Sequence, residues 1–484
     1  MLPWRTLLGV LSVTAGIATG CATEPRPAAA SATSVQASEA PTSETPPFSA
    51  RGGEVSPTRP PPPPIKALGQ VTLAAVGDVL MHEAVKQSAA AHGATAPDGG
   101  YSYLFSPVAD LLSQPDLAFA NLETPIAPQV SRGSRSFVFN APPAVVSALQ
   151  HAGIGLVSVA NNHALDQGRA GFEETLHWLQ AAGLPYVGAG PSPNAAGPVR
   201  IERNGVRLAF LGYTYGLNES GNACPPPKPD LPPCLQASVL DRGTVVEDVR
   251  AAAAGADAVI VSLHWGTEYE RQPRAPDVEL AHRLADAGAL VVLGHHPHVL
   301  QPIELYRRTD GQIAVIAYSL GNFISNQSRN FLPGVTPEAV AATRDGVLLR
   351  VALAKRDYGR GVVRVEVVGT DFLPLWTEND TVEIDPKKEP ARRPAIRVVA
   401  VDRALAQVRS ELESLPDPLP KAQVERWVRL RQREELYLQR RAAVASLLGE
   451  DLLRVLSADE LALPAGAPAG DAGKGGMRLG EPLW

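Results

Sequence analysis

The chain has 484 residues, of which 45% are hydrophobic, and its formal net charge at pH 7 is -6. This length and composition allow one large or two ordinary globular domains with a sizeable core. Because there is no overall basic excess, the composition gives no support for a nucleic-acid-binding protein, and we predict no nucleic-acid partner.

The first 21 residues have the features of an export signal. Arg5 is followed by an apolar run over residues 7–17, and Ala18-Thr-Gly-Cys21 closes that run. The run is too short for a membrane-spanning helix and is typical of a secretory signal. Small residues before a single cysteine resemble the lipobox of bacterial lipoproteins, although Ala18 replaces the usual Leu. We therefore expect export to the bacterial cell envelope, periplasmic or at the cell surface, with a lipid on Cys21 as membrane anchor.

Two segments have compositions that do not support a packed fold. Residues 22–68 are rich in Ala, Ser, Thr, Glu and Pro, and Arg59 is followed by five prolines. This composition predicts a disordered, partly extended tether. Residues 466–484 are predicted to form a disordered tail.

Short apolar runs alternate with helical stretches over residues 69–385. The runs predicted as strands begin at residues 71, 116, 155, 206, 258, 289 and 313, with later strands over 346–354 and 362–368. The predicted helices cover residues 143–152, 171–182, 241–254 and 276–287. Alternation of this kind predicts an α/β domain with a mixed or parallel sheet covered by helices.

Six of these strands are followed directly by polar side chains of the kinds that bind metals or substrates. Ligands of open α/β sheets bind at the carboxyl ends of strands, so we expect these side chains to converge. Carboxylate, amide and imidazole groups suit Zn, Mn or Fe, and their number is sufficient for two divalent ions. We predict the metal ligands to be Asp78, Glu123, Asn162, His264, His296 and His298. Two adjacent ions would favour hydrolysis at phosphorus.

His163 directly follows Asn162 and is predicted to donate a proton to a leaving group or a hydrogen bond to a phosphate oxygen. Either His295 or His296 could be the first histidine ligand of this motif. We favour His296, because His296 and His298 flank Pro297 and side chains at alternate positions can point the same way. Other candidates for ligand support or substrate binding are His82, Asn161, His295, Glu268 and Asn322. His82 remains open as either a ligand or a residue that supports one.

Two further features lie outside this set. Cys224 and Cys234 enclose a proline-rich stretch, and in an exported chain such a close pair predicts a disulfide rather than a metal site. Residues 386–465 contain Glu/Arg-rich stretches over 399–415 and 421–448, which predict an accessory helical pair packed on the main domain.

The strand-end motifs resemble those of a known family. They are Gly-Asp78, Asn-Leu-Glu123, Asn-Asn-His163, His-Trp-Gly266, Gly-His-His-Pro-His298 and Ser-Leu-Gly-Asn-Phe323. In this order and spacing they resemble the capsule-biosynthesis family of the calcineurin-like metallophosphatases, named for the poly-γ-glutamate capsule protein CapA. The resemblance covers about residues 70 to 370.

The resemblance implies a four-layer α-β-β-α sandwich with a dinuclear metal centre at one edge. The six predicted ligands match the family's ligand positions, and His163 matches its catalytic histidine. The chain departs from the general metallophosphatase pattern because it has no Asp-X-His at the first motif, where His82 comes later, and because Glu123 replaces the usual Asp. The family's role is in making, exporting or anchoring poly-γ-glutamate, but a fold does not determine a substrate.

Three functions are compatible with the sequence. The first is a tethered metal-dependent hydrolase that acts on a phosphorylated substrate or an anionic envelope polymer, with capsule synthase subunits as partners. The second is a non-catalytic scaffold that holds such a polymer or organises a synthase complex, and it would tolerate His163→Ala. The third is a nucleotide phosphodiesterase, which is disfavoured because few aromatic residues are available to stack a base. Those residues are Tyr213, Tyr215, Trp265 and Phe323.

Overall fold

The structure, a computed structural model, describes residues 64–461 apart from 94, 134–135, 192–196, 227–233, 385–386 and 388–389. The chain divides into two units, residues 1–61 and 62–484, and every described residue belongs to the second. The predicted signal with Cys21, nearly all of the predicted tether and the predicted tail therefore lie outside the described residues.

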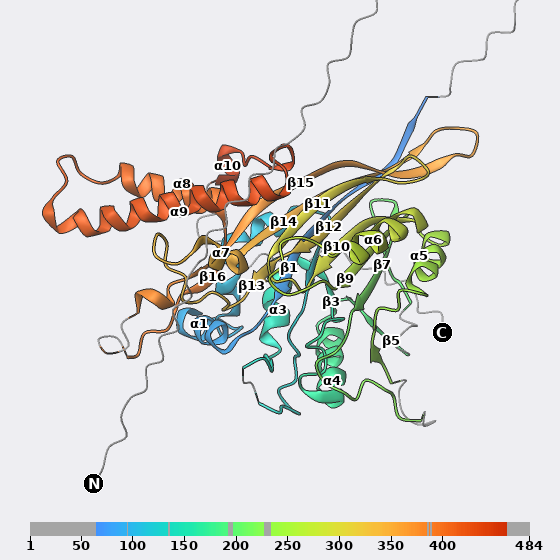
Figure 1. The fold of residues 1–484 in the computed structure, drawn as a ribbon, viewed down its shortest axis with the longest axis horizontal. Coiled ribbons are helices and arrows are strands. Elements are labelled where there is room, and N and C mark those ends of the chain that lie inside the picture. Colours follow the sequence, from blue (N-terminus) through green and yellow to red (C-terminus); the bar gives the residue numbers. More distant parts are fainter. Residues whose placement is uncertain are drawn as a thin grey trace, which may run out of the picture. The chain divides into compact units, whose positions relative to one another are not determined.

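Two large β-sheets form the centre of the second unit (Figure 1). The first sheet has the order β16 (Ile396–Ala400), β15 (Val363–Asn379), β14 (Asp345–Asp357), β1 (Lys66–Val79), β2 (Leu117–Asn121), β3 (Ile154–Ser158) and β4 (Tyr186–Val187), and β13 (Asn322–Ile324) also pairs with β1. The second has the order β11 (Leu300–Arg307), β12 (Ile313–Leu320), β10 (Ala289–His295), β9 (Ala258–His264), β7 (Val206–Thr214) and β6 (Val199–Arg203). A small third sheet pairs β5 (Ala189–Gly190) with β8 (Gln236–Ala237).

Both large sheets have parallel strands at the centre and antiparallel strands at an edge. β1, β2, β3 and β4 run parallel, as do β7, β9, β10 and β12. All seven residues of β9 and all seven of β10 are buried, which explains their continuous runs of Val, Leu and Ile. Because the central strands are parallel, their carboxyl ends lie together at one edge of each sheet.

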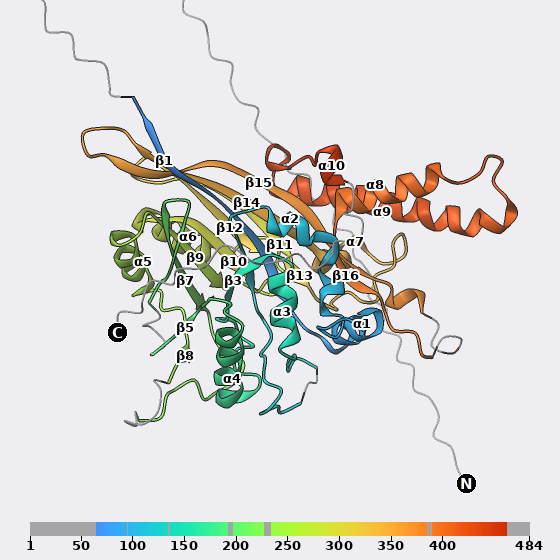
Figure 2. The same cartoon turned by 180° about the vertical axis from the view of Figure 1, so that it is seen from behind.

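Helices surround the two sheets. They are α1 (Glu83–Gly93), α2 (Ala109–Ser113), α3 (Ala144–His151), α4 (Gly168–Ala181), α5 (Val245–Ala254), α6 (Ala275–Ala287), α7 (Glu338–Ala341), α8 (Val401–Glu413), α9 (Val424–Leu448) and α10 (Ala458–Leu461). Seen from behind in Figure 2, α3 and α4 lie near β3, and α5 and α6 lie near β7 and β9. None of the helices among these residues has both the length and the apolar composition needed to cross a bilayer.

The buried apolar side chains form separate clusters that correspond to layers. Phe119 of β2 and Phe210 of β7 belong to one cluster, which joins the two sheets. A second cluster joins the first sheet to α3 and α4, and a third joins the second sheet to α5 and α6. Burial of apolar surface on both faces of each sheet stabilises this arrangement. The predicted mixed α/β class is confirmed.

The C-terminal region contains the two predicted helices, α8 and α9, and also a strand. β16 pairs antiparallel with β15, so the first sheet extends beyond residue 385, where the sequence predicted the domain to end. Val444 and Leu448 of α9 contribute to the cluster between the sheets, and Tyr437 packs in a fourth cluster with Trp376 of β15. Part of α9 is therefore built into the core.

Candidate metal centre

The carboxyl ends of strands from both sheets deliver the six predicted ligands to one buried place. Asp78 lies in β1, Glu123 and Asn162 follow β2 and β3, His264 ends β9, and the last two histidines follow β10. Each of the six is at most 4% exposed. The strand register explains the convergence, because Asp78 lies opposite Asn121 and Asn322, and His264 lies opposite His295.

The carboxylate and imidazole atoms form two overlapping groups. Asp78, Glu123 and His264 form one group, and Glu123, His296 and His298 form the other, with the ligand atoms of each group within 4.8 Å of one another. Glu123 is common to both. Asn162 adds an amide oxygen, since its Oδ1 lies 2.8 Å from Nε2 of His264. The two groups share the Glu123 carboxylate, and their donor types suit a metal ion.

Several buried polar atoms in this cluster have no hydrogen-bond partner. They are Oε1 of Glu123, Nδ1 of His296, Nε2 of His295 and Oδ1 of Asn161. Oε1 of Glu123 lies 3.4 Å from Nε2 of His264 and 3.9 Å from Nε2 of His298. Unpartnered buried polar atoms are rare because each loses the hydrogen bonds that water would give it. Of these four atoms, Oε1 of Glu123 and Nδ1 of His296 belong to residues of the ligand groups, and carboxylate and imidazole are donor types that cations prefer.

The two buried carboxylates have opposite pKa shifts. Burial alone would raise the pKa of Asp78, but His295 and His298, which contact its two oxygens at 3.1 and 3.3 Å, hold it well below its usual value. Burial and the neighbouring carboxylate of Asp78 raise the pKa of Glu123 well above its usual value. A carboxylate in this position lacks a positive neighbour of its own, and a cation beside it would supply one.

Three imidazoles at this place, those of His264, His296 and His82, have lowered pKa values and favour their neutral forms. Burial and the neighbouring His296 lower the pKa of His264 well below its usual value. Burial and His298 lower the pKa of His296 to about 4. Burial also lowers the pKa of His82 to about 4. Neutral imidazole is the form that binds a metal ion, so these histidines are prepared for that role near neutral pH.

His163 lies beside the ligand groups and belongs to neither. Its Nδ1 contacts Oδ2 of Asp166 at 2.9 Å, and that oxygen also accepts the backbone N–H of Phe139. The ring of Phe139 lies 4.6 Å from the His163 ring. The carboxylate and the phenyl ring thus hold the imidazole in one orientation. Sequence reasoning missed Asp166, although its spacing of three residues after His163 was a usable signal.

The remaining candidates have supporting or separate positions. His82 accepts the backbone N–H of Asn326 at 3.2 Å and packs edge-on against Phe139. Oδ1 of Asn322 lies 3.1 Å from Nδ1 of His298, and Nδ2 of Asn161 donates to the Leu122 carbonyl at 2.9 Å. His295 contacts Asp78 and is absent from both ligand groups.

Two further residues lie close to the buried cluster. Glu268, a candidate for ligand support or substrate binding, is exposed, and its charge contributes to the raised pKa of Glu123. Asn121, which was not singled out, is fully buried and donates from Nδ2 to Oδ1 of Asp78 at 2.8 Å. Its place two residues before Glu123 at the end of a strand was the available signal.

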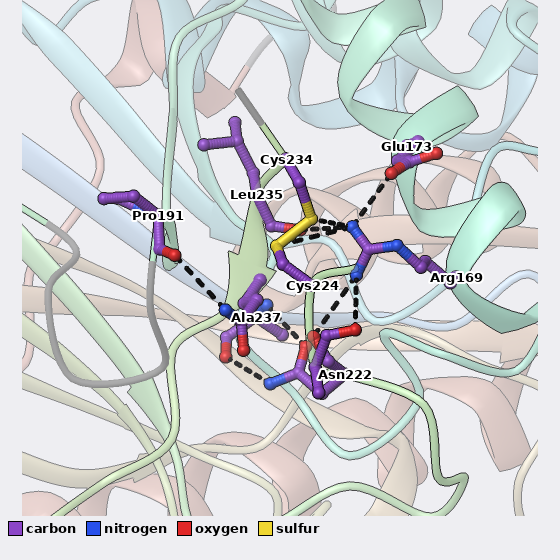
Figure 3. Close-up of a disulfide and its surroundings, with 10 residues drawn as sticks. Arg169, Glu173, Pro191, Asn222, Cys224, Cys234, Leu235 and Ala237 are labelled. Atoms are coloured by element: carbon purple, nitrogen blue, oxygen red, sulfur yellow. Dashed lines mark hydrogen bonds and ion pairs between the residues drawn. A yellow bond between two sulfur atoms is a disulfide. The ribbon is translucent and has the colours of Figure 1, made fainter. Parts of the chain in front are cut away.

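Cys224 and Cys234 form a disulfide close to the helix that follows the His163 loop (Figure 3). Arg169 in the first turn of α4 contacts both sulfur atoms and pairs with Glu173 at 2.9 Å. In Figure 3 the guanidinium of Arg169 points at the disulfide and at the backbone near Asn222. A disulfide of this kind suggests an oxidising, extracytoplasmic compartment.

Fold and site together define a mixed α/β protein with a buried carboxylate and imidazole cluster suited to metal ions. Residues 72–327, more than half of the chain, match the family described as bacterial capsule synthesis protein PGA_cap, and the chain belongs to this family.

Its relatives carry capsule-related names. The chain is 31% identical over 301 residues to capsule biosynthesis protein CapA of Bacillus anthracis, covering 61% of this chain and 66% of that protein. It is 33% identical over 304 residues to PGA biosynthesis protein CapA of Bacillus subtilis (strain 168), covering 62% and 72%. The chain thus spans about two thirds of the length of these relatives.

Among solved structures, the chain is similar to the calcineurin-like phosphoesterase YfkN from Bacillus subtilis. The match has 15% sequence identity and a TM-score of 0.34, and it covers 63% of this chain and 90% of that one. At this level of similarity, no property of that enzyme is carried over to this chain.

Proposed function

We propose that this protein is an exported, lipid-anchored hydrolase that uses two divalent ions, Mn, Zn or Fe, to cleave a phosphoester or a related bond. Its role would be in the biosynthesis or export of poly-γ-glutamate or another envelope polymer. We also propose that the two sheets and their helices form the four-layer α-β-β-α sandwich of the metallophosphatases. The observation that carries it is the unpartnered Oε1 of Glu123, which lies between two groups of buried ligands.

The ligands divide between two ions. Asp78, Glu123 and His264, with the amide oxygen of Asn162, would hold one ion, and Glu123, His296 and His298 would hold the other. When bound, two such ions activate a water molecule and stabilise charge on phosphate oxygens.

Other residues would move and direct a proton. Asp166 engages Nδ1 of His163, so Nε2 is the nitrogen that can give a proton to the leaving-group oxygen. Asn162 is oriented from its other side, because its Nδ2 donates to Oδ1 of Asn218 at 3.4 Å. The contact between His163 and Asp166 supports an enzyme rather than a scaffold, since a protein that only holds a polymer does not need an oriented proton donor.

The biological setting rests on the relatives and on the sequence. The printed names of the two Bacillus relatives support an envelope polymer, or a phosphorylated intermediate of one, as substrate, and synthase subunits as partners. The disulfide supports an extracytoplasmic location, and the lipid anchor rests on the motif that ends at Cys21.

The test combines metal analysis with turnover of bis(p-nitrophenyl) phosphate by the full chain. We expect about two ions per chain, fewer in His296→Ala, and no change in the control His177→Ala, whose side chain is exposed on α4. His163→Ala should keep the metal and lose about 100-fold or more in turnover.

Two results would count against the hydrolase. Full metal content without turnover of any phosphoester, together with poly-γ-glutamate binding that tolerates His163→Ala, would make the protein a scaffold. A wild-type chain that stays metal-free after incubation with Mn and Zn would overturn the metal centre itself.

A further inference from the structure

Two partly exposed tyrosines border the candidate metal centre. Tyr215 follows β7 and is 45% exposed, and Tyr269 lies in the loop after β9 and is 52% exposed. The ring of Tyr215 lies 4.6 Å from that of His296, and the ring of Tyr269 lies 6.2 Å from that of His298. The other aromatic residues that the sequence offered for stacking, Tyr213, Trp265 and Phe323, are buried.

Both tyrosines are attached to the same backbone that carries the ligands. The N–H of Tyr215 donates to the carbonyl of His264 at 2.8 Å, and the N–H of Tyr269 donates to the carbonyl of Pro297 at 2.8 Å. The backbone of each tyrosine is therefore fixed relative to the predicted metal ligands, so that both rings start from the border of the candidate site, as a substrate-positioning group requires.

The hydroxyl of Tyr269 is linked to a ligand as well. This hydroxyl accepts a hydrogen bond from Nε2 of Gln327 at 3.5 Å. Oε1 of Gln327 in turn accepts a hydrogen bond from Nδ2 of Asn322 at 2.9 Å. Asn322 in turn contacts His298. A short polar chain thus connects the half-exposed ring with the buried imidazole.

The backbone at this rim is strained. Tyr269 has φ 66°, and the nearby His296 and His298 have φ 94° and 57°. For a bulky residue the left-handed region is unfavourable, and strain of this kind persists where the surroundings impose it, often at ligand sites. Tyr269 gains little core packing in exchange, because half of its side chain faces solvent.

The polar groups beside the tyrosines indicate what kind of group would lie on them. Glu268 is exposed next to Tyr269, and Asn218 is exposed three residues after Tyr215. A sugar ring has an apolar face that packs on an aromatic ring, and hydroxyls that bond to carboxylates and amides. The negative charge of Glu268 would repel the carboxylates of a glutamate polymer at the same place.

We propose that Tyr215 and Tyr269 form a sugar-binding subsite, so that the substrate is a phosphoester of a sugar. This inference rests on the proposed hydrolase function and narrows its substrate class. In the reaction, a water oxygen bonds to phosphorus, the bond from phosphorus to the sugar oxygen breaks, and that oxygen leaves with a proton as a free hydroxyl. The phosphate group remains as the second product.

The test measures binding to the metal-loaded full chain by calorimetry, with non-hydrolysable phosphonates as probes. Methylphosphonate carries no ring, the glucose phosphonate carries a sugar and the adenosine phosphonate carries a base. We expect the glucose probe to bind about tenfold more tightly than methylphosphonate, which corresponds to about 1.4 kcal/mol. Tyr215→Ala with Tyr269→Ala should remove this difference, so that the glucose probe and methylphosphonate bind with equal affinity.

Controls and outcomes separate the subsite from the function. Trp427→Ala removes an aromatic side chain that is 39% exposed on α9 and should behave as wild type. Tyr269→Phe keeps the ring and should retain most of the sugar preference.

Equal affinity of the wild type for glucose phosphonate and methylphosphonate would overturn the sugar-binding subsite and leave the proposed hydrolase function intact. Preference for the adenosine probe that is lost in the double variant would make the subsite a base site. If no phosphonate binds, the proposed function itself fails.

Discussion

Nε2 of His264 lies 2.8 Å from Oδ1 of Asn162, although the two residues follow or end strands of different sheets. The contact spans the two layers at the edge where their parallel strands end. The candidate metal centre therefore depends on how the two sheets are placed against each other, and substitutions in either sheet should weaken it.

Glu123 is the ligand that both groups share, so its loss should affect both ions. We expect Glu123→Gln to lower the metal content from about two ions per chain to one or fewer, because an amide has one acceptor oxygen and no charge. Elemental analysis measures this directly. Glu425→Gln changes an exposed carboxylate of α9, away from the site, and serves as the matched control. Two ions retained in Glu123→Gln would contradict the shared-ligand arrangement.

Asp166 should act through His163. Asp166→Asn keeps the shape of the side chain and removes the charge that orients the imidazole, and we expect turnover to fall by about 10- to 100-fold. The metal content and KM should stay near their wild-type values. In a His163→Ala background the same substitution should have little further effect, and additive losses would show that Asp166 acts independently.

Gly294 in β10 has no room for a side chain. A Cβ there would lie 1.9 Å from the carbonyl oxygen of Tyr318 in the neighbouring β12. We expect Gly294→Ala to lower the free energy of unfolding by about 2–3 kcal/mol, because it forces the two strands apart just before the histidine motif. Gly197→Ala, where a Cβ meets nothing within 4 Å, should change it by less than about 0.5 kcal/mol. Thermal or denaturant unfolding measures both, and equal effects would refute the steric explanation.

Glu378 of β15 forms ion pairs that connect the C-terminal helix α9 with the first sheet. Its carboxylate pairs with Arg397 of β16 and Arg433 of α9, each at 2.7 Å. Burial alone would raise the pKa of Glu378, but the two arginines and Tyr437 lower it below its usual value of 4.5. A lowered pKa stabilises the fold above the unfolded-state value and loses that contribution as pH falls through the folded-state value.

We therefore expect Glu378→Gln to destabilise the protein by about 2 kcal/mol at pH 7, since both arginines lose their charged partner. The difference from wild type should shrink as the pH falls below about 4.5. Urea unfolding at several pH values tests this, with the exposed Glu425→Gln of α9 as control. A difference that is the same at pH 7 and at low pH would assign the effect to packing instead of charge.

The disulfide should contribute to stability and leave the metals in place. Cys224 and Cys234 are 10 residues apart, and their bond restricts a short loop. Replacing both by Ser should lower the free energy of unfolding by about 2–3 kcal/mol, because the unfolded chain gains freedom. Reduction of the wild type should have a similar effect, and reduction of the variant should have none. Loss of metal from the variant would show that the loop also holds Asn162 and Asn218 in place.

Local pattern was sufficient for much of the fold and for the convergence of the six predicted ligands at one place. β9 and β10 were predictable because fully buried strands are continuous in Val, Leu and Ile, and α3 and α6 were predictable within one residue at each end. That these six residues meet could be predicted because parallel strands bring their carboxyl ends together whatever the details of packing. These features could be predicted because each depends on a short stretch of sequence.

Tertiary structure decided what depends on distant parts of the chain. β1 begins at Lys66 because that residue pairs with Asp357, and β16 lies in the sheet because it pairs with β15. Tertiary structure also decided how the parallel strands divide between two sheets. It likewise decided the exposure of Glu268 and the position of Tyr269 beside His298. Contacts between residues that are far apart in the sequence form only as the chain folds, because their free energy comes from burial and pairing that no short stretch of sequence contains.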